Sequence, residues 1–177
     1  MSRVHVIAGH RWCVELDLER FFDRVNHDIL MACVERRIED KGVLRLIRRY
    51  LEAGVMSGGI VSHRQEGTPQ GGIISPTLAN MCLNGLESNL LAHLVAQHGI
   101  TRARNLKINV IRYADDFVVT GNSQELLHNE IRPWIEAFLA QRGLRLSPTK
   151  TRVTHIDQGF DFLGWNFRKY SGTLLIK

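Results

Sequence analysis

Apolar and polar residues alternate along the first well-defined segment of the chain, residues 12–17. A period of two residues predicts a β-strand, because successive side chains of a strand point to opposite faces. The two faces of this expected strand carry Trp12, Val14 and Leu16 on one side and Cys13, Glu15 and Asp17 on the other. The strand therefore ends at an acidic residue.

The spacing changes to that of helices in the next part of the chain. Asn26 is a suitable N-cap for a helix with apolar residues three and four positions apart, and a second such pattern covers residues 43–53. Ser75 and Pro76 match the N-cap and first position of a long helix that we expect to continue to Gly99.

Two apolar strands within residues 107–120 flank Asp115 and Asp116. They predict a β-hairpin with both acids at or near its tip. Two like charges about 4 Å apart repel by roughly 4 kcal/mol at an effective dielectric constant near 20. Such a pair among apolar neighbours must therefore reach water, share a proton or face a cation.

A third helix and further strands complete the expected order of elements. Asn122, with Glu125 three positions later, resembles a capping box for a helix that Pro133 should kink or split. Residues 144–156 and 160–167 read as extended segments. The order β, α, α, loop, α, hairpin, α, β, β predicts an α+β fold, with helices on one face of an antiparallel sheet.

Length and composition predict one folded domain over residues 1–177. Hydrophobic residues make up 44% of the chain and charged residues 23%, which excludes a disordered protein. No apolar run approaches the roughly 18 residues of a membrane span, and the first residues lack the apolar centre of a secretion signal. We therefore expect a cytoplasmic protein with no membrane partner.

Cysteine spacing and charge narrow the function classes. The three cysteines form no CxxC pair, which argues against a zinc knuckle or a disulfide framework. The net charge is +5, and only five of 23 basic residues are lysines. An arginine-rich surface suits phosphate groups, so either a nucleic acid partner or an ordinary solvated basic surface agrees with the charge.

Asp17 changes the interpretation of the acid pair. Mg²⁺ usually takes one or two carboxylates, and a two-metal phosphoryl-transfer site needs a further carboxylate from another strand. Asp17 stands at the end of the first strand, where a side chain leaves the close-packed sheet. Asp17, Asp115 and Asp116 together are therefore a candidate divalent metal site.

Five strings along the chain, in this order, resemble the reverse transcriptases encoded by bacterial group II introns. They are LDLERFFDRVNHDILM (16–31), EGTPQGGIISPTLAN (66–80), RYADD (112–116), LRLSPTKT (144–151) and FLGW (162–165). The resemblance implies a polymerase palm, an antiparallel sheet of the split βαβ, ferredoxin/RRM-like type with helices on one face. It also implies an RNA-directed DNA polymerase that acts by two-metal nucleotidyl transfer.

The resemblance assigns roles to individual residues. It implies that Asp17, the backbone carbonyl of Leu18, Asp115 and Asp116 hold two Mg²⁺ or Mn²⁺ ions. The residues implied to contact the incoming nucleotide are Phe22, Gln70, Gly71, Ala114 and Lys150, with Phe22 excluding a ribose 2′-hydroxyl. Tyr113 and Gly164 are implied to contact primer and template. Simpler roles stay open. Asp17 can be a strand-end cap and Phe22 a core residue. Gln70 can be a turn residue and Lys150 a solvated lysine.

The implied partners are an RNA template, a DNA primer, deoxynucleoside triphosphates and, for a full-length protein, intron RNA. The resemblance also implies that residues 1–177 correspond to the palm, with fingers and thumb or maturase regions outside it, so we expect feeble polymerisation from the chain alone. One alternative is an RNA-binding maturase remnant that assists splicing without polymerising. Another is a related reverse transcriptase of a CRISPR array, a retron or a diversity-generating element.

Overall fold

The computed structural model describes residues 11–19, 24–52, 55–57, 60–62, 74–114, 116–171 and 173–177. The chain divides into two compact units. The first comprises Met1–Asp17, Gly85–Phe138 and Leu146–Lys177, and the second comprises Leu18–Asn84 and Leu139–Arg145. Among the described residues, no helix combines the length and the apolar character required to cross a membrane.

The first unit is built on a four-stranded antiparallel sheet with the strand order β4-β5-β1-β6. The strands are β1 (Trp12–Leu16), β4 (Asn109–Tyr113), β5 (Asp116–Gly121) and β6 (Arg152–His155). Strand β1 lies inside the sheet, between β5 and β6, which explains why apolar side chains occupy most of its length.

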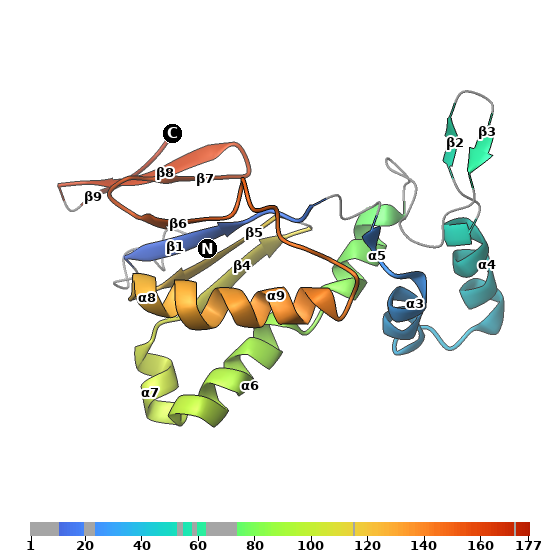
Figure 1. The fold of residues 1–177 in the computed structure, drawn as a ribbon, viewed down its shortest axis with the longest axis horizontal. Coiled ribbons are helices and arrows are strands. Elements are labelled where there is room, and N and C mark those ends of the chain that lie inside the picture. Colours follow the sequence, from blue (N-terminus) through green and yellow to red (C-terminus); the bar gives the residue numbers. More distant parts are fainter. Residues whose placement is uncertain are drawn as a thin grey trace. The chain divides into compact units, whose positions relative to one another are not determined.

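Helices cover one face of this sheet (Figure 1). They are α6 (Leu86–His98), α7 (Ile100–Asn105) and a continuous helix made of α8 (Gln124–Leu126), the π-helical segment η1 (Leu127–Ile131) and α9 (Arg132–Ala140). The split expected at Pro133 takes the form of the π-helical turn before it, where the N–H of Arg132 bonds to the carbonyl of Leu127.

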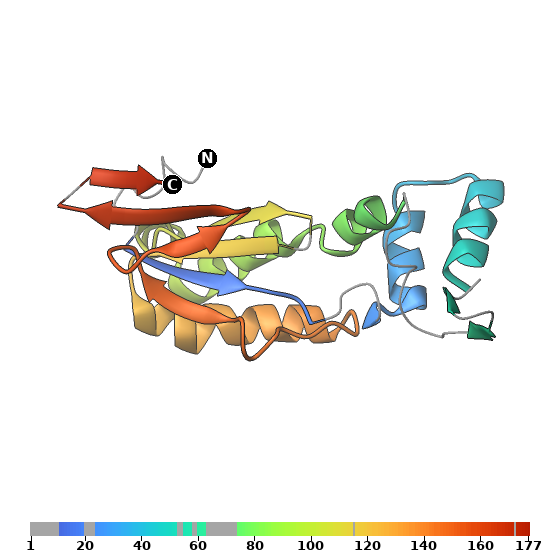
Figure 2. The same ribbon diagram turned by 90° about the horizontal axis from the view of Figure 1, so that it is seen from above.

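A second, three-stranded sheet covers the opposite face (Figures 1 and 2). Its strands are β7 (Phe160–Phe162), β8 (Trp165–Tyr170) and β9 (Thr173–Ile176), in that order. The buried residues that join the two sheets are Cys13, Val118, Ile156, Phe160 and Phe167. The two faces of β1 are therefore both apolar near Trp12, and polar residues gather only toward Asp17.

In the residues that the structure describes, the second unit contains three helices and a short antiparallel hairpin. The helices are α3 (His27–Glu35), α4 (Lys41–Glu52) and α5 (Ser75–Cys82), and the hairpin strands are β2 (Val55–Ser57) and β3 (Ile60–Ser62). As the sequence predicts, Asn26 caps α3: its side-chain oxygen accepts a hydrogen bond from the backbone N–H of Ile29 at 3.0 Å. Asp40 caps α4 in the same way, through Gly42 and Val43.

The α+β class and the helices on one sheet face are confirmed, but two details were wrong. The long helix expected from Ser75 to Gly99 is interrupted after Cys82, and α6 begins at Leu86, because Gly85 adopts a left-handed conformation with φ of 86°. Ser75 is also inside α5 rather than its N-cap.

The N-cap expected at Asn122 is also wrong. Ser123 caps the helix instead, accepting a hydrogen bond from the N–H of Leu126, while the Asn122 amide donates to the carbonyl of Asn105 at 2.9 Å. The contact to a distant residue therefore decides which of two suitable neighbours becomes the cap.

Candidate active site

The ends of β1 and β5 bring two carboxylates together. The two strands pair with Leu16 opposite Phe117, so one further step in the same register places Asp17 opposite Asp116. Directly opposed residues of antiparallel strands have Cβ atoms about 4.5–5.5 Å apart. Both side chains point away from the helix-covered face, because Leu16 and Phe117 occupy that face. Asp17 and Asp116 therefore stand at facing strand ends, and their joint binding of a metal stays a prediction.

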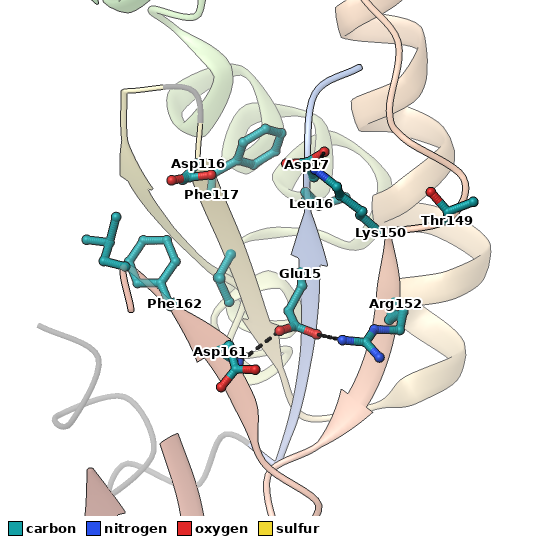
Figure 3. Close-up of a pocket in the computed structure, with 12 residues that line it drawn as sticks. Glu15, Leu16, Asp17, Asp116, Phe117, Thr149, Lys150, Arg152, Asp161 and Phe162 are labelled. Carbon is teal, nitrogen blue, oxygen red and sulfur yellow. Dashed lines mark hydrogen bonds and ion pairs between the residues drawn. The ribbon is translucent and has the colours of Figure 1, made fainter. Parts of the chain in front are cut away.

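A cavity of about 410 Å³ lies over these two residues (Figure 3). Residues of β1, β5, the segment before β6 and the β7–β8 turn line it. Its polar lining consists of Glu15, Asp17, Asp116, Thr149, Lys150, Arg152 and Asp161. The strand ends thus supply carboxylates, and the segment from 149 to 152 supplies cations.

Lys150 provides the counter-charge of Asp17. Its Nζ lies 3.3 Å from Oδ2 of Asp17, with 69% of the lysine side chain and 34% of the aspartate side chain exposed. The turn that carries Lys150 is fixed to β1, because the N–H of Ser147 donates to the carbonyl of Asp17 at 2.8 Å. The Lys150 ammonium is therefore placed beside Asp17 but remains free to move in solvent.

The β4–β5 connection presents the second acidic position. Tyr113 pairs with Asp116, and Ala114, which follows Tyr113, adopts a left-handed φ of 54°. Nη1 of Arg112 donates to the carbonyl of Ala114 at 3.3 Å, which braces the turn from its own strand. Burial lowers the pKa of Arg112 from its ordinary value. Asp116 itself is exposed at the strand end.

The other expected residues fall in different places. Asp115, Phe22, Gln70 and Gly71 lie outside the described residues. Leu18 is buried and belongs to the second unit.

Two further expected residues lie in turns or at turn edges of the first unit. Tyr113 is 66% exposed. Gly164 stands in the β7–β8 turn at φ of 78°, next to the cavity-lining Leu163.

Four polar cavity residues were missed from the sequence: Glu15, Thr149, Arg152 and Asp161. The signal for Glu15 was present, because the alternation of β1 places it on the same face as Asp17. Arg152 is opposite Glu15 in the β1–β6 register, and that pairing of distant segments is not readable from local spacing.

The donor set suits a hard divalent cation. Four carboxylates line the cavity (Glu15, Asp17, Asp116 and Asp161), and none of its lining residues is a histidine or a cysteine. Oxygen ligands are those that Mg²⁺ and Mn²⁺ prefer. Within the part of the chain that the structure describes, which excludes Asp115, no group of three or more metal-binding side chains occurs. Asp17 and Asp116 thus fit part of a magnesium site.

Comparison with known proteins identifies similar sequences. The family model described as reverse transcriptase (RNA-dependent DNA polymerase) matches residues 2–167. Protein YkfC of Escherichia coli (strain K12) is 34% identical over 87% of this chain and 46% of its own length. The group II intron-encoded protein LtrA of Lactococcus lactis subsp. cremoris is 27% identical over 94% of this chain and 37% of its own length. The resemblance drawn from the five strings is thereby confirmed.

Solved structures share the fold. Telomerase from Candida albicans, solved in complex with the TWJ fragment of telomeric RNA, superimposes with a TM-score of 0.67 and 14% identity. The match covers 93% of this chain and 31% of the telomerase chain. The chain therefore spans less than half the length of the relatives and of the structure that it matches.

Proposed function

This chain belongs to the reverse transcriptase (RNA-dependent DNA polymerase) family, and on that premise we propose that its cavity adds deoxynucleotides to the 3′ end of a primer as directed by an RNA template. The observation that carries the proposal is the register of β1 and β5, which sets Asp17 opposite Asp116 at the floor of an open cavity. We further propose that residues 1–177 act as the palm of a polymerase of the group II intron type.

The reaction forms a bond between the primer 3′-oxygen and the α-phosphorus of the nucleotide, and it releases pyrophosphate. Two Mg²⁺ or Mn²⁺ ions held by Asp17, Asp115 and Asp116, when bound, supply activation of the 3′-hydroxyl and neutralisation of the leaving group. Asp17 and Asp116 come from different strands of one sheet, so the sheet fixes their separation before substrate binds.

Lys150 has a separate role in the proposal. Its side chain is 69% exposed, and the contact of its ammonium within the described residues is the ion pair to Asp17, so we expect it to turn toward the triphosphate. There it donates a proton to the departing pyrophosphate. Tyr113 and Gly164 contact primer and template, and Ala114 contacts the nucleotide.

The remaining assignments stay predictions. They are Phe22, Gln70 and Gly71 at the nucleotide, Leu18 as a carbonyl ligand, intron RNA as a partner, and a cytoplasmic location. The intron type is supported by the similarity to LtrA, whose name describes a group II intron-encoded protein.

Variants of the two carboxylates test the proposal. We expect Asp17→Asn and Asp116→Asn each to reduce Mg²⁺-dependent primer extension on an RNA template at least about 100-fold, or about 2.7 kcal/mol in transition-state free energy. The matched control is Asp157→Asn, an exposed aspartate in the turn before β7, which should retain activity.

A binding measurement complements the activity assay, because the chain spans less than half of its relatives. Mn²⁺ titration followed by electron paramagnetic resonance should show binding by the unaltered chain and by Asp157→Asn, and weaker binding by Asp17→Asn. Unchanged extension and unchanged Mn²⁺ binding in both carboxylate variants would contradict the proposal. RNA binding without any extension would support the splicing remnant instead.

A further inference from the structure

Glu15 is a largely buried carboxylate in the middle of β1. Only 14% of its side chain is exposed, and it occupies the same face of the strand as Asp17, two residues away. Glutamate is rarely buried to this extent without partners, because removing a charge from water costs more free energy than packing returns. The contacts of Glu15 therefore require a structural explanation.

Two segments distant in sequence supply the partners (Figure 3). Oε1 of Glu15 accepts a hydrogen bond from the backbone N–H of Asp161, in β7, at 2.9 Å. Oε2 lies 3.8 Å from Nη2 of Arg152, the residue opposite Glu15 in β6. Because 69% of the Arg152 side chain is exposed, water screens the ion pair, and the hydrogen bond is the tighter contact.

The hairpin geometry explains why the Asp161 N–H needs this acceptor. Leu163 and Gly164 both have positive φ, 53° and 78°, and form a two-residue turn closed by the pair Phe162 and Trp165. Hydrogen-bonded and non-hydrogen-bonded pairs alternate along an antiparallel ladder, so the N–H of Asp161 points away from β8.

Among the strands that the structure describes, β7 is at the edge of its sheet, and its outward N–H faces no strand partner there. The Glu15 carboxylate takes the place of that missing strand.

We propose that Glu15 is a positioning residue that holds the β7–β8 turn at a fixed distance from Asp17 and Asp116. Asp161 is two residues from Leu163, which lines the cavity, and Glu15 is two residues from Asp17. One hydrogen bond therefore connects the turn to the carboxylate end of β1. This inference rests on the proposed function, in which the β7–β8 turn contacts the primer. A turn held in place then sets the primer end above Asp17 and Asp116.

Hydrogen exchange tests the contact without substrate. In Glu15→Ala, we expect the amide of Asp161 to exchange at least about tenfold faster, as measured by NMR on the whole chain. The amide of Lys169, which bonds to the carbonyl of Ile156 in the same three-stranded sheet, serves as an internal control and should not change. Glu15→Gln keeps an acceptor oxygen, so the exchange rate of its Asp161 amide should lie between those of the unaltered chain and of Glu15→Ala.

Primer binding tests the positioning role. We expect Glu15→Ala to raise the Kd for a primer–template duplex, measured by fluorescence anisotropy, and the KM for that duplex by about tenfold, with a smaller effect on kcat. Mn²⁺ binding should be unchanged, and Glu15→Gln should restore part of the affinity. Glu87→Ala, at an exposed position of α6 outside the cavity lining, is the matched control and should behave like the unaltered chain.

The outcomes separate this inference from the proposed function. Unchanged exchange at Asp161, or faster exchange with unchanged duplex affinity, overturns the positioning role. If the unaltered chain binds duplex without extending it, the polymerase proposal fails, while the Glu15 assignment is still decided by exchange and affinity. A chain that binds no duplex overturns both. Thermal unfolding of each variant confirms that it is folded.

Discussion

At the scale of single residues, the cavity combines four carboxylates with the two cations Lys150 and Arg152. Asp17 keeps Lys150 as its neighbour, and the same carboxylate is the one we assign to divalent metal. A cation that binds Asp17 must therefore displace the ammonium or share the carboxylate with it. Displacing the ammonium costs little free energy, because an exposed ion pair contributes at most about 1 kcal/mol.

Lys150→Ala should therefore separate metal binding from turnover. We expect Mn²⁺ to bind up to about fivefold more tightly, because its competitor at Asp17 is removed. Primer extension should nevertheless fall, because the proton donor is lost. Lys150→Arg, which keeps the charge, is the control for metal affinity; weaker Mn²⁺ binding by Lys150→Ala would contradict the competition.

The sequence predicted residues that a local pattern marks and missed those that distant pairing defines. Asp17 was identified because it ends an alternating strand, and Asp116 because it interrupts an apolar one. Asp161 was missed because its part in the cavity is a backbone N–H, which every non-proline residue has. Its role follows only from the turn that leaves this N–H unpaired.

At the scale of elements, the strands were predictable, whereas two of the three expected N-caps and the break after Cys82 were not. The apolar spacing from Ser75 to Gly99 continues through the break, because Leu83 and Leu86 are both buried. Periodicity alone therefore could not show that α5 and α6 are separate helices. Asn26 was recognised correctly as a cap because no distant residue competes for its side chain in the contacts described here.

The N-cap of α4 should make that helix sensitive to acid. Hydrogen bonds from the backbone N–H groups of Val43 and Gly42 lower the pKa of Asp40. A carboxyl with a lowered pKa in the folded state contributes stability above its ordinary pKa, and that contribution is lost as the pH falls through the lowered pKa. NMR chemical shifts of Gly42 and Val43 should follow this loss.

Asp40→Asn is the matched control for the acid titration, because it keeps an acceptor oxygen that does not titrate. Its Val43 amide should show no transition in the same acidic range. An identical transition in both proteins would show that Asp40 is not the titrating group.

At the scale of the whole molecule, the three cysteines are distributed over both units, so their reactivity can be used to follow each unit. Cys13 belongs to the first unit, and Cys33 and Cys82 belong to the second. Burial is the main cause that raises the pKa of Cys13 and that raises the pKa of Cys82 to about 12. Cys33 is half-buried. The native fold therefore protects two thiols and leaves one partly accessible.

Alkylation should distinguish these thiols. At pH 8 the thiolate fraction of Cys82 is on the order of 10⁻⁴, since the pKa is about 12. We expect iodoacetamide to modify Cys33 first and to reach Cys13 and Cys82 only when urea opens their units, as followed by peptide mass spectrometry. Rapid native labelling of Cys13 would contradict the packing between the two sheets.

The short connection between β4 and β5 has little room for inserted or deleted residues. Tyr113 pairs directly with Asp116, and β5 then alternates faces along its length. Adding or removing one residue in the turn either bulges a strand or exchanges the faces, which would bring Phe117 toward solvent and send Asp116 into the apolar layer beneath the helices. The number of residues in this hairpin therefore determines where the negative charge of Asp116 lies.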